Sequence, residues 1–393
     1  MTIGIDANSI IYDKSGIGKY TFNLIKSILN IDTTNNYVLF FNSVKDVKKQ
    51  SQLIADLTAN AKAAFEIQRS FLPLNFRDYL TNFPINTKLF YPRSLDLMHF
   101  PFYSGIPVKP IIPSIATLHD VTFLKLPEIY TKKTQNIPLK KTQMALENCT
   151  KIIATSINTK KDLVGSLQAD PTKIQVIDEG VADTYRLLKK PILINKLRLF
   201  QLKYKQYILA IASVEPTKNL AKLIKAYALL PHLLRQQYPL VLIGKISGKS
   251  QLQTLIYDLN LSKQIVTLGT LLEKDMPTVF SGAKLFVSVS LYEGFSSSII
   301  EAMACGIPVV ASNKAAIAEV TSQEILTANP YKEEEIVRAI QNLLESEELA
   351  ATYEKKSLHQ ARKYSWARAG AETIRFYEKT FQTHIENNNK KYQ

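Results

Sequence analysis

The sequence is poor in cysteine and contains no long apolar run. Only Cys149 and Cys305 occur among 393 residues, which is too few for a disulfide scaffold and fits a reducing compartment. No segment reaches the roughly 18 uncharged apolar residues that a membrane-spanning helix needs. The first residues, Met1 to Asp6, lack the basic and apolar regions of a signal peptide. These absences predict a cytoplasmic protein.

The ionisable residues show neither a metal-ligand pattern nor a nucleic-acid footprint. The five histidines and two cysteines lack the spacing of metal ligands. The chain carries 49 basic and 34 acidic residues, but both halves share the excess and no basic cluster stands out. We therefore expect no bound metal and no nucleic-acid partner. Phosphorylated substrates or an anionic membrane surface account for the net charge of +15 at least as well.

Short β-rich runs alternate with longer amphipathic stretches along most of the chain. The predicted strands are Thr2–Asp6, Tyr37–Phe41, Ile115–Leu118, Ile152–Thr155, Ile174–Ile177, Tyr207–Ala212, Leu240–Ile243, Val266–Leu268, Leu285–Val289 and Val309–Ala311. The helical stretches include Tyr20–Leu29, Asn158–Leu167, Leu220–Leu230 and Ser297–Ala304. This alternation is typical of βαβ units around parallel sheets, so the fold class is α/β.

The length of the chain predicts two domains, because one hydrophobic core seldom extends over so many residues. The basic segment Tyr185–Gln206 lacks a clear strand and is the expected boundary. We predict an N-terminal domain over residues 1–187 and a C-terminal domain over 188–366. Residues 367–393 are expected to form a helix that packs back on the N-terminal domain and ends in a disordered tail. Two facing α/β sheets would bind a ligand between them, beyond the carboxyl ends of their strands.

The segment from Tyr292 to Val310, YEGFSSSIIEAMACGIPVV, is the most informative part of the sequence. After the preceding strand, Ser296 or Ser297 is placed to cap a helix that stops at Gly306. The N–H groups of Phe295 to Ser298 would point out of the helix N-terminus. The positive end of the helix dipole favours a diphosphate there.

Two carboxylates accompany this helix. Glu293 precedes it and Glu301 lies one turn inside it, so both can flank one ligand. A carboxylate suits neighbouring sugar hydroxyls because it accepts two hydrogen bonds. For an isolated pair of glutamates, solvated or capping roles would be the better interpretation. A binding site is favoured because the Gly-Phe-Ser loop, the small-residue helix and the Gly-x-Pro stop occur in register.

This segment closely resembles the E-x₇-E signature of family-4 retaining glycosyltransferases and the Glu-Ala-Met-Ala-x-Gly-x-Pro-Val-Val run that follows it. The resemblance implies the GT-B fold: two Rossmann-like domains, an N-terminal one for the acceptor and a C-terminal one for the nucleotide sugar. It implies that Glu301 binds the ribose hydroxyls of the donor. It also implies that the transferred sugar and the diphosphate are held by Glu293 and by the main chain of Gly294, Phe295, Ser296 and Ser297.

Two segments of the first half resemble the same family. Ser15-Gly16-Ile17-Gly18-Lys19-Tyr20 lies between the first strand and the first helix, where Gly16 would let the backbone approach a phosphate or sugar. Taken alone it is as easily an ordinary turn. Leu118-His119-Asp120 follows a strand directly. The resemblance implies that His119 reaches the sugar or the reacting phosphate, whereas an isolated His-Asp pair is more often structural.

Two segments of the second half complete the resemblance. In Val214-Glu215-Pro216-Thr217-Lys218-Asn219, Lys218 would neutralise the leaving diphosphate, although alone it would pass for a surface charge. Thr217 stands where the family has arginine, so as a substrate-binding residue its hydroxyl can donate a hydrogen bond but cannot supply that charge. Leu268–Leu272 resembles the turn, with Leu271, that contacts the nucleotide base; without the family it is an ordinary strand exit. Glu179 also departs from the family pattern, which has asparagine or histidine there.

Other nucleotide-binding patterns do not fit. Gly244–Ser250 follows a strand and looks like a phosphate-binding P-loop, but its glycines are separated by three residues where the P-loop needs four. No Gly-x-Gly-x-x-Gly follows the first strand. These departures disfavour a kinase, an ATPase and a nicotinamide oxidoreductase.

We therefore expect a hexosyltransferase of the nucleotide-sugar-dependent, retaining kind, with Glu293, His119 and Lys218 as catalytic residues. The donor is expected to be a GDP- or UDP-hexose, with GDP favoured by likeness to mannosyltransferase-like members. The acceptor is expected to be a glycan or a lipid-linked precursor, without a metal or cofactor. A catalytically degenerate module that binds a membrane or a partner is the alternative. The basic–aromatic segment Phe65–Leu97 would serve a lipid interface, although core packing explains such a segment more readily.

Overall fold

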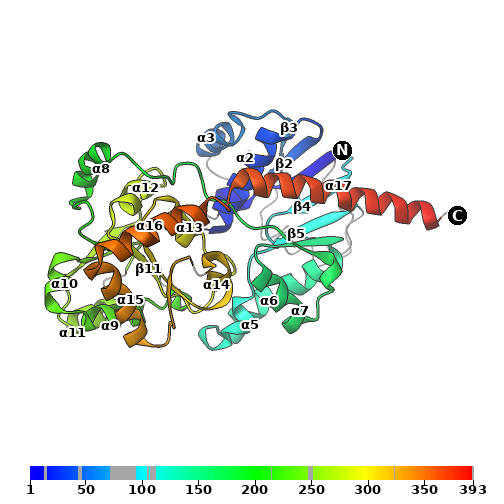
Figure 1. Ribbon diagram of the computed structural model, residues 1–393. Coiled ribbons are helices and arrows are strands. Elements are labelled where there is room, and N and C mark those ends of the chain that lie inside the picture. Colours follow the sequence, from blue (N-terminus) through cyan, green and yellow to red (C-terminus); the bar gives the residue numbers. More distant parts are fainter. Residues whose placement is uncertain are drawn as a thin grey trace. The chain divides into compact units, whose positions relative to one another are not determined.

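The computed structural model contains two compact units. It describes residues 1–12, 16–42, 47–70, 94–103, 106, 112–213, 215–246, 251–322 and 324–391. The N-terminal unit comprises Met1–Gly180 and Ser365–Gln393, and the C-terminal unit comprises Val181–Tyr364 (Figure 1). These boundaries fall earlier than the predicted ones after residues 187 and 366, because the chain from Val181 onward already packs into the core of the C-terminal unit.

The N-terminal unit is built on a seven-stranded sheet in the order β3-β2-β1-β4-β5-β6-β7. All neighbouring strands in it are parallel. The strands are β1 (Thr2–Asp6), β2 (Asn36–Asn42), β3 (Ala64–Ser70), β4 (Leu97–Phe100), β5 (Ser114–Leu118), β6 (Lys151–Ala154) and β7 (Ile174–Val176). The five strands predicted for this half are confirmed, and the sequence reading missed β3 and β4.

Helices follow the strands of this unit, as expected for βαβ units. The α-helices are α1 (Ser9–Tyr12), α2 (Gly16–Ile31), α3 (Val47–Thr58), α5 (Thr122–Lys125), α6 (Lys132–Asn148), α7 (Ile157–Leu167) and α17 (Trp366–Lys391). Two short 3₁₀ helices are η2 (Pro127–Ile129) and η3 (Pro171–Lys173). The polar stretch after Asn387, expected to be a disordered tail, continues α17 as far as Lys391.

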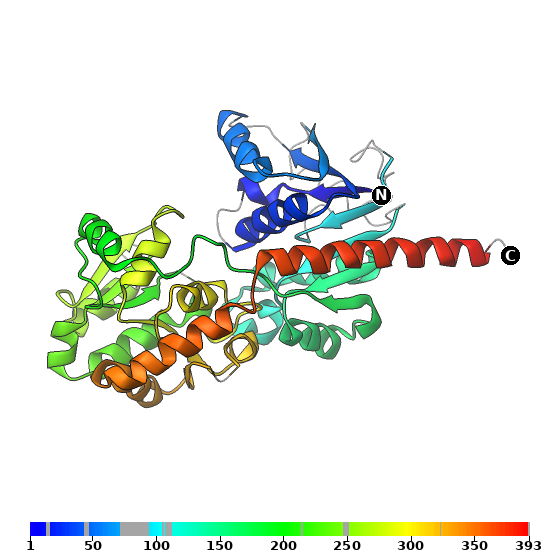
Figure 2. The same ribbon diagram turned by 45° about the horizontal axis from the view of Figure 1, so that its top comes forward.

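Helix α17 packs along α2 and so returns the C-terminus to the N-terminal unit (Figures 1 and 2). The hydroxyl of Ser27 donates to the carbonyl oxygen of Trp366 at 2.6 Å. Buried His99 on β4 bonds through Nδ1 to the Tyr377 hydroxyl at 2.6 Å and through Nε2 to the Thr117 hydroxyl at 2.9 Å. Burial, followed by the nearby charge of His119, lowers the pKa of His99 to about 3. His99 is therefore a neutral structural residue that joins α17 to the sheet.

The C-terminal unit is built on a six-stranded parallel sheet in the order β10-β9-β8-β11-β12-β13. The strands are β8 (Ile208–Ile211), β9 (Leu240–Ile243), β10 (Ile265–Gly269), β11 (Leu285–Ser288), β12 (Val309–Ser312) and β13 (Leu326–Ala328). The five predicted strands of this half are confirmed, and β13 is additional. The fold class inferred from the sequence, two Rossmann-like α/β halves, is therefore confirmed.

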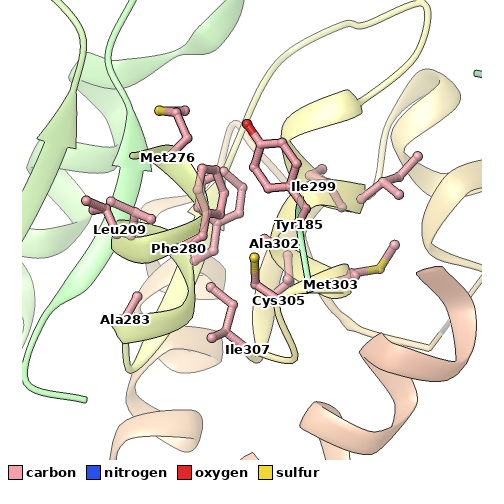
Figure 3. Packing of buried hydrophobic residues seen from close by; sticks show 14 of the residues in the cluster. Tyr185, Leu209, Met276, Phe280, Ala283, Ile299, Ala302, Met303, Cys305 and Ile307 are labelled. Carbon is pink, nitrogen blue, oxygen red and sulfur yellow. The ribbon is translucent and has the colours of Figure 1, made fainter. Parts of the chain in front are cut away.

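Helices cover both faces of this second sheet. They are α8 (Lys190–Leu197), α9 (Leu220–Leu229), α10 (His232–Gln237), α11 (Gln251–Asp258), α12 (Met276–Gly282), α13 (Ser297–Ala304), α14 (Ala315–Thr321), α15 (Glu333–Glu345) and α16 (Glu347–Ala361), with 3₁₀ helices η4 (Arg198–Phe200) and η5 (Pro216–Lys218). Successive strand residues face opposite cores, as a two-residue period requires. Leu209 packs with α8, α12 and α13, whereas Ile208 and Ala210 pack with α9 and α15. Figure 3 shows the first of these cores.

None of the helices in the described ranges is both long and apolar enough to cross a bilayer.

Candidate active site

The C-terminal sheet has a topological switch point between β8 and β11. The sheet continues through β9 on one side and through β12 on the other, so the connections after β8 and β11 run in opposite directions. In open parallel sheets, ligands bind beyond the carboxyl ends of the strands at such a point. Helix η5 follows β8, and the loop that leads to α13 follows β11. The predicted residues Lys218 and Glu293 thus lie on the two sides of the switch point.

Lys218 and Glu293 form an ion pair at this place. Nζ of Lys218 donates to Oε1 of Glu293 at 3.0 Å. The Ser290 hydroxyl donates to the same oxygen at 2.6 Å, and the Ser296 hydroxyl donates to Oε2 at 2.7 Å. The Glu293 side chain is 8% exposed and the Lys218 side chain 27%. The carboxylate is therefore held in one orientation by three donors, while about a quarter of the Lys218 side chain remains exposed.

Asn219 fixes the position of Lys218. Its backbone is left-handed, with φ of 54°, at the junction of η5 and α9, a conformation that asparagine tolerates better than most residues. Its side-chain amide donates to the carbonyl oxygens of Val289 at 3.2 Å and Pro330 at 2.7 Å. These two bonds tie the end of η5 to the segments that follow β11 and β13.

Thr217, which replaces the arginine of the family pattern, is almost buried at 8% exposure. Its carbonyl oxygen accepts a hydrogen bond from the N–H of Leu291 at 2.8 Å. The bond joins η5 to the loop that carries Glu293. Thr217 therefore holds the segment in place through its main chain, and Lys218 is the cation that this segment retains.

The N-terminus of α13 lies beside the ion pair. Ser296 takes the N-cap position, as expected, but its hydroxyl bonds to Glu293 and makes no side-chain cap. The first N–H groups of a helix lack acceptors within the helix, and together with the dipole they form a site for an anion. Gly306, with φ of 70°, follows the last turn, as the sequence predicted.

Glu301, one turn into α13, is half-buried near Tyr185. Tyr185 is 3% exposed, and its hydroxyl donates to Oε1 of Glu273 at 2.8 Å. Burial, and then the charges of Glu301 and Glu273, raise the pKa of Tyr185 far above its usual value, so the phenol stays protonated and donates. Figure 3 shows this hydroxyl pointing away from Cys305 and Ile307 of the apolar cluster.

The turn after β10 is connected to the same residues. Leu271 is half-buried against the apolar cluster that contains Tyr185, and Glu273 comes two residues later. Tyr185 therefore links the turn predicted to contact the base with the helix that carries the predicted ribose ligand, Glu301.

In the N-terminal unit, His119 follows β5 directly. Its Nε2 lies 2.9 Å from the carbonyl oxygen of Pro101, and its Nδ1 lies 3.5 Å from Oε1 of Glu179. Burial by itself would lower the pKa of His119, but Glu179, the Pro101 carbonyl and Asp120 together hold it above its usual value. Because both ring nitrogens face acceptors, the imidazolium form is favoured.

Gly16 begins α2, so the glycine-containing segment belongs to a helical turn and not to the predicted loop. Ser15 lies outside the described residues. A Cβ atom at Gly16 would meet nothing within 4 Å, so packing does not require glycine there. Further along α2, the Tyr20 ring packs edge-on against the His119 ring, with centroids 4.6 Å apart. Helix α2 thus positions His119.

Within the described ranges, no group of three or more histidine, cysteine or acidic residues is placed to hold a metal ion.

Gly244, the first glycine of the segment that resembles a P-loop, is required for a structural reason. Gly244 has φ of 132°, and a Cβ atom there would lie 1.9 Å from the carbonyl oxygen of Ala212. Its N–H donates to the carbonyl oxygen of Gly269 at 2.8 Å. The glycine therefore permits a close approach of strands, and residues 247–250 of the segment lie outside the described ranges.

Sequence reasoning missed four residues that contact or support the predicted site residues of one unit or the other. Ser290, Asn219 and Tyr185 contact or support predicted site residues, and Glu179 pairs with His119. Ser290 and Ser296 each lie three residues from Glu293, and that symmetry was the only available signal. No sequence signal pointed to Tyr185, because Glu273 lies 88 residues away in the chain and Glu301 lies further still.

Comparison with known proteins first defines the class. Sucrose-phosphate synthase from Thermosynechococcus elongatus superimposes with a TM-score of 0.75 over 98% of this chain and 100% of that one, at 17% identity. HepE of Anabaena, in complex with UDP and glucose, gives a TM-score of 0.74 over 96% of this chain and 100% of that one, also at 17% identity. At this identity the likeness shows the fold alone, and the fold is GT-B.

Sequence comparison then gives the family. The family of glycosyl transferases group 1 matches residues 197–360. O-antigen chain mannosyltransferase B of Escherichia coli is 29% identical over 266 residues, which are 67% of this chain and 70% of that protein. Residues 197–360 thus match the group 1 glycosyl transferases, so the resemblance seen in the E-x₇-E segment is confirmed, and the chain is a glycosyltransferase with the GT-B fold.

Proposed function

We propose that the chain transfers a hexose from a nucleotide-diphosphate sugar to a glycan or lipid-linked acceptor, with retention of configuration and without a divalent metal. The ion pair between Lys218 and Glu293 at the switch point carries this proposal. It puts a cation for a leaving diphosphate next to a carboxylate for a sugar, beside a helix N-terminus. A catalytically degenerate binding module would have no need to keep these three features together.

Glu293 is suited to hold the transferred sugar. A carboxylate offers about four acceptor positions, and the protein fills two on Oε1 and one on Oε2. A sugar hydroxyl would donate to Oε2. The main chain at Gly294, Phe295, Ser296 and Ser297 would hold the diphosphate.

The chemistry follows from charge. As the bond between the anomeric carbon and the diphosphate oxygen breaks, negative charge grows on the diphosphate. Lys218 and the α13 N-terminus stabilise that charge, and these groups make a divalent metal unnecessary. The acceptor oxygen attacks from the face that the leaving group departs from, and a departing phosphate oxygen takes the acceptor proton. His119 contributes positive charge in this scheme and transfers no proton, because both its ring nitrogens are engaged.

We assign binding of the nucleotide part of the donor to the second carboxylate, Glu301. Glu301 would accept from the ribose hydroxyls, and the main chain near Leu271 would contact the base. For the sugar we propose mannose, carried by GDP, because the relative compared above is named a mannosyltransferase. The name of that relative, an O-antigen chain enzyme, supports a glycan acceptor for this chain as well. UDP-glucose is the second donor to test, because HepE was solved with UDP and glucose.

The first prediction is that GDP-mannose stabilises the protein in a buffer that contains EDTA. A ligand that binds only the native state, at about 100 times its Kd, stabilises it by about 2.7 kcal/mol, which corresponds to a Tm rise of roughly 5 °C or more. Thermal-shift measurement with GDP-, UDP- and ADP-sugars tests this. Absence of a shift with every donor would contradict the proposal, and a shift seen only after magnesium is added would contradict the metal-free site. Donor hydrolysis without acceptor separates an active enzyme from a degenerate one.

The second prediction concerns Tyr185. Its hydrogen bond to Glu273 orders the turn at Leu271, so Tyr185→Phe should raise the donor KM by about two- to tenfold, the value of one hydrogen bond, while kcat changes little. Steady-state kinetics with varied donor measure this split.

Tyr207→Phe is the matched control for Tyr185→Phe. Tyr207 is equally buried in the same core, but its hydroxyl donates to the carbonyl oxygen of Val279 and not to a site carboxylate. It should lower Tm without raising the donor KM. Equal KM changes in the two variants would mean that Tyr185 acts only on stability.

A further inference from the structure

Helix α8 carries basic and apolar side chains on one exposed stripe. Ile192 and Lys196 of α8 and Leu199 of η4 are separated by four and three residues, the spacing that lines up side chains on one helix face. Lys189 lies three residues before Ile192, at the N-cap of α8, where the backbone is extended. The helical backbone continues from α8 into η4 without a break, because Leu197 and Arg198 keep right-handed conformations. These four residues are called the α8 stripe below.

The apolar members of the α8 stripe are not part of a core. Ile192 is 53% exposed and Leu199 is 81% exposed. A neighbouring face of α8 is the one that packs, since Leu193 and Leu197 are buried against α12 and its neighbours. Figure 1 shows α8 at the edge of the C-terminal unit, next to α12. The fold therefore anchors one face of α8 and leaves the α8 stripe in water.

The chain segment that carries the α8 stripe has charged side chains of one sign. Between Thr184 and Val214 the sequence contains no acidic residue. Seven basic residues occur in that interval, namely Arg186, Lys189, Lys190, Lys196, Arg198, Lys203 and Lys205. Lys205 pairs with Glu354 at 2.7 Å, and Lys190 lies over the Tyr204 ring at 5.4 Å. Arg186, Lys189, Lys196 and Arg198 are exposed around the apolar side chains, and so is Leu187, at 67%.

We infer that the α8 stripe is a docking surface for an anionic lipid bilayer. Scattered exposed apolar residues need no explanation, but here they alternate with cations on one helix face. Phosphates of a nucleic acid would use the cations and leave Ile192 and Leu199 in water. A lipid interface accepts both kinds of side chain, with the apolar ones at the acyl boundary and the lysines at the headgroups. Charge complementarity therefore selects anionic lipid.

This surface differs from the one that the sequence suggested. The basic–aromatic segment Phe65–Leu97 was the sequence-based candidate for a lipid interface, and most of it lies outside the described residues. The α8 stripe belongs to the unit that carries Lys218 and Glu293. It goes beyond the proposed transfer reaction and does not depend on it, because none of its residues contributes to the site.

The test is binding of the full-length protein to lipid vesicles by flotation. We expect binding to phosphatidylcholine vesicles that contain about 30% phosphatidylglycerol, a proportion that keeps the surface strongly anionic. Binding to vesicles of phosphatidylcholine alone should be weak. Binding should weaken as salt is raised. Lys189→Gln with Lys196→Gln should lower the partition coefficient about 30-fold, and Ile192→Ser with Leu199→Ser should lower it roughly tenfold or more.

Matched controls come from the same unit. Lys225 and Lys263 are exposed lysines outside the stripe, and Leu229 and Leu233 are 57% and 77% exposed. Lys225→Gln with Lys263→Gln changes net charge equally, and Leu229→Ser with Leu233→Ser removes similar apolar exposure. All variants should keep the wild-type Tm and donor hydrolysis. No binding to anionic vesicles, equal losses in stripe and control variants, or unchanged binding in the stripe variants would each overturn the inference.

Discussion

Replacing Glu293 with glutamine is expected to lower kcat by roughly ten- to a hundredfold, with a smaller change in donor KM. Glu293 accepts hydrogen bonds from Lys218, Ser290 and Ser296, and glutamine at that position cannot accept from all three in the same way or supply the charge. A charge-assisted hydrogen bond contributes about 1.5–3 kcal/mol, which corresponds to this range of rates. The effect falls on kcat because, in the proposed reaction, the contacts near the sugar change as the bond breaks.

Initial rates of transfer or donor hydrolysis test this prediction, with circular dichroism to show that the variant folds. Glu333→Gln is the matched control, because Glu333 pairs with Lys222 at 3.1 Å in the same unit and is not part of the site. Glu301→Gln is the comparison inside the site and should raise the donor KM instead. Near wild-type kinetics for Glu293→Gln would refute the assignment. A kcat loss confined to Glu301→Gln would mean that Glu301 holds the sugar and Glu293 the ribose, the reverse of the proposed roles.

Replacing Lys218 with alanine is expected to lower kcat by at least as much. The change removes the cation that would stabilise the leaving diphosphate. It also leaves the Glu293 carboxylate, which is 8% exposed, without its charged partner. Loss of one partner of a shielded ion pair destabilises the protein, so Tm should fall as well. Enzyme kinetics and thermal unfolding of the same variant measure the two effects separately.

Lys222→Ala is the control for this change, since Lys222 is 31% exposed and Lys218 is 27% exposed in ion pairs of nearly equal length. It should cost some stability and leave kcat unchanged. The double variant Glu293→Gln with Lys218→Ala should lose less activity than the two single losses combined, because the two residues share one interaction. Fully independent losses would show that the ion pair is incidental to the reaction.

Much of the fold could be predicted because local patterns encode it. The alternation of β-rich runs and helices located every predicted strand within about one or two residues. Ile208 and Ala210 face one core and Leu209 faces the other, so a strand that is buried on both faces has a continuous run of apolar residues. The missed strands β4 and β13 are only four and three residues long, and β3 is exposed over most of its length. Such strands are defined by their neighbours in the sheet, so their own residues predict them poorly.

The candidate site also has parts that could be predicted from the sequence and parts that could not. The residues from Tyr292 to Gly306 could be recognised because strand, loop, helix and stop follow each other in the chain. The capping role expected for the Ser296 hydroxyl was misread, since a local rule could not anticipate that this side chain would turn to Glu293. The helix expected to start at Tyr20 starts at Gly16, because glycine lowers helix propensity without forbidding a first turn.

The sequence by itself determined the α/β class, the order of the strands along the chain and the candidate carboxylates and lysine, because these depend on neighbouring residues. Only the tertiary structure decided that Lys218 and Glu293, 75 residues apart, form an ion pair. It also decided that Tyr185 reaches Glu273, 88 residues away, and that Glu179 faces His119. The physical reason is that strand order in a parallel sheet brings the carboxyl ends of distant strands to one edge, and spacing along the chain carries no record of that order.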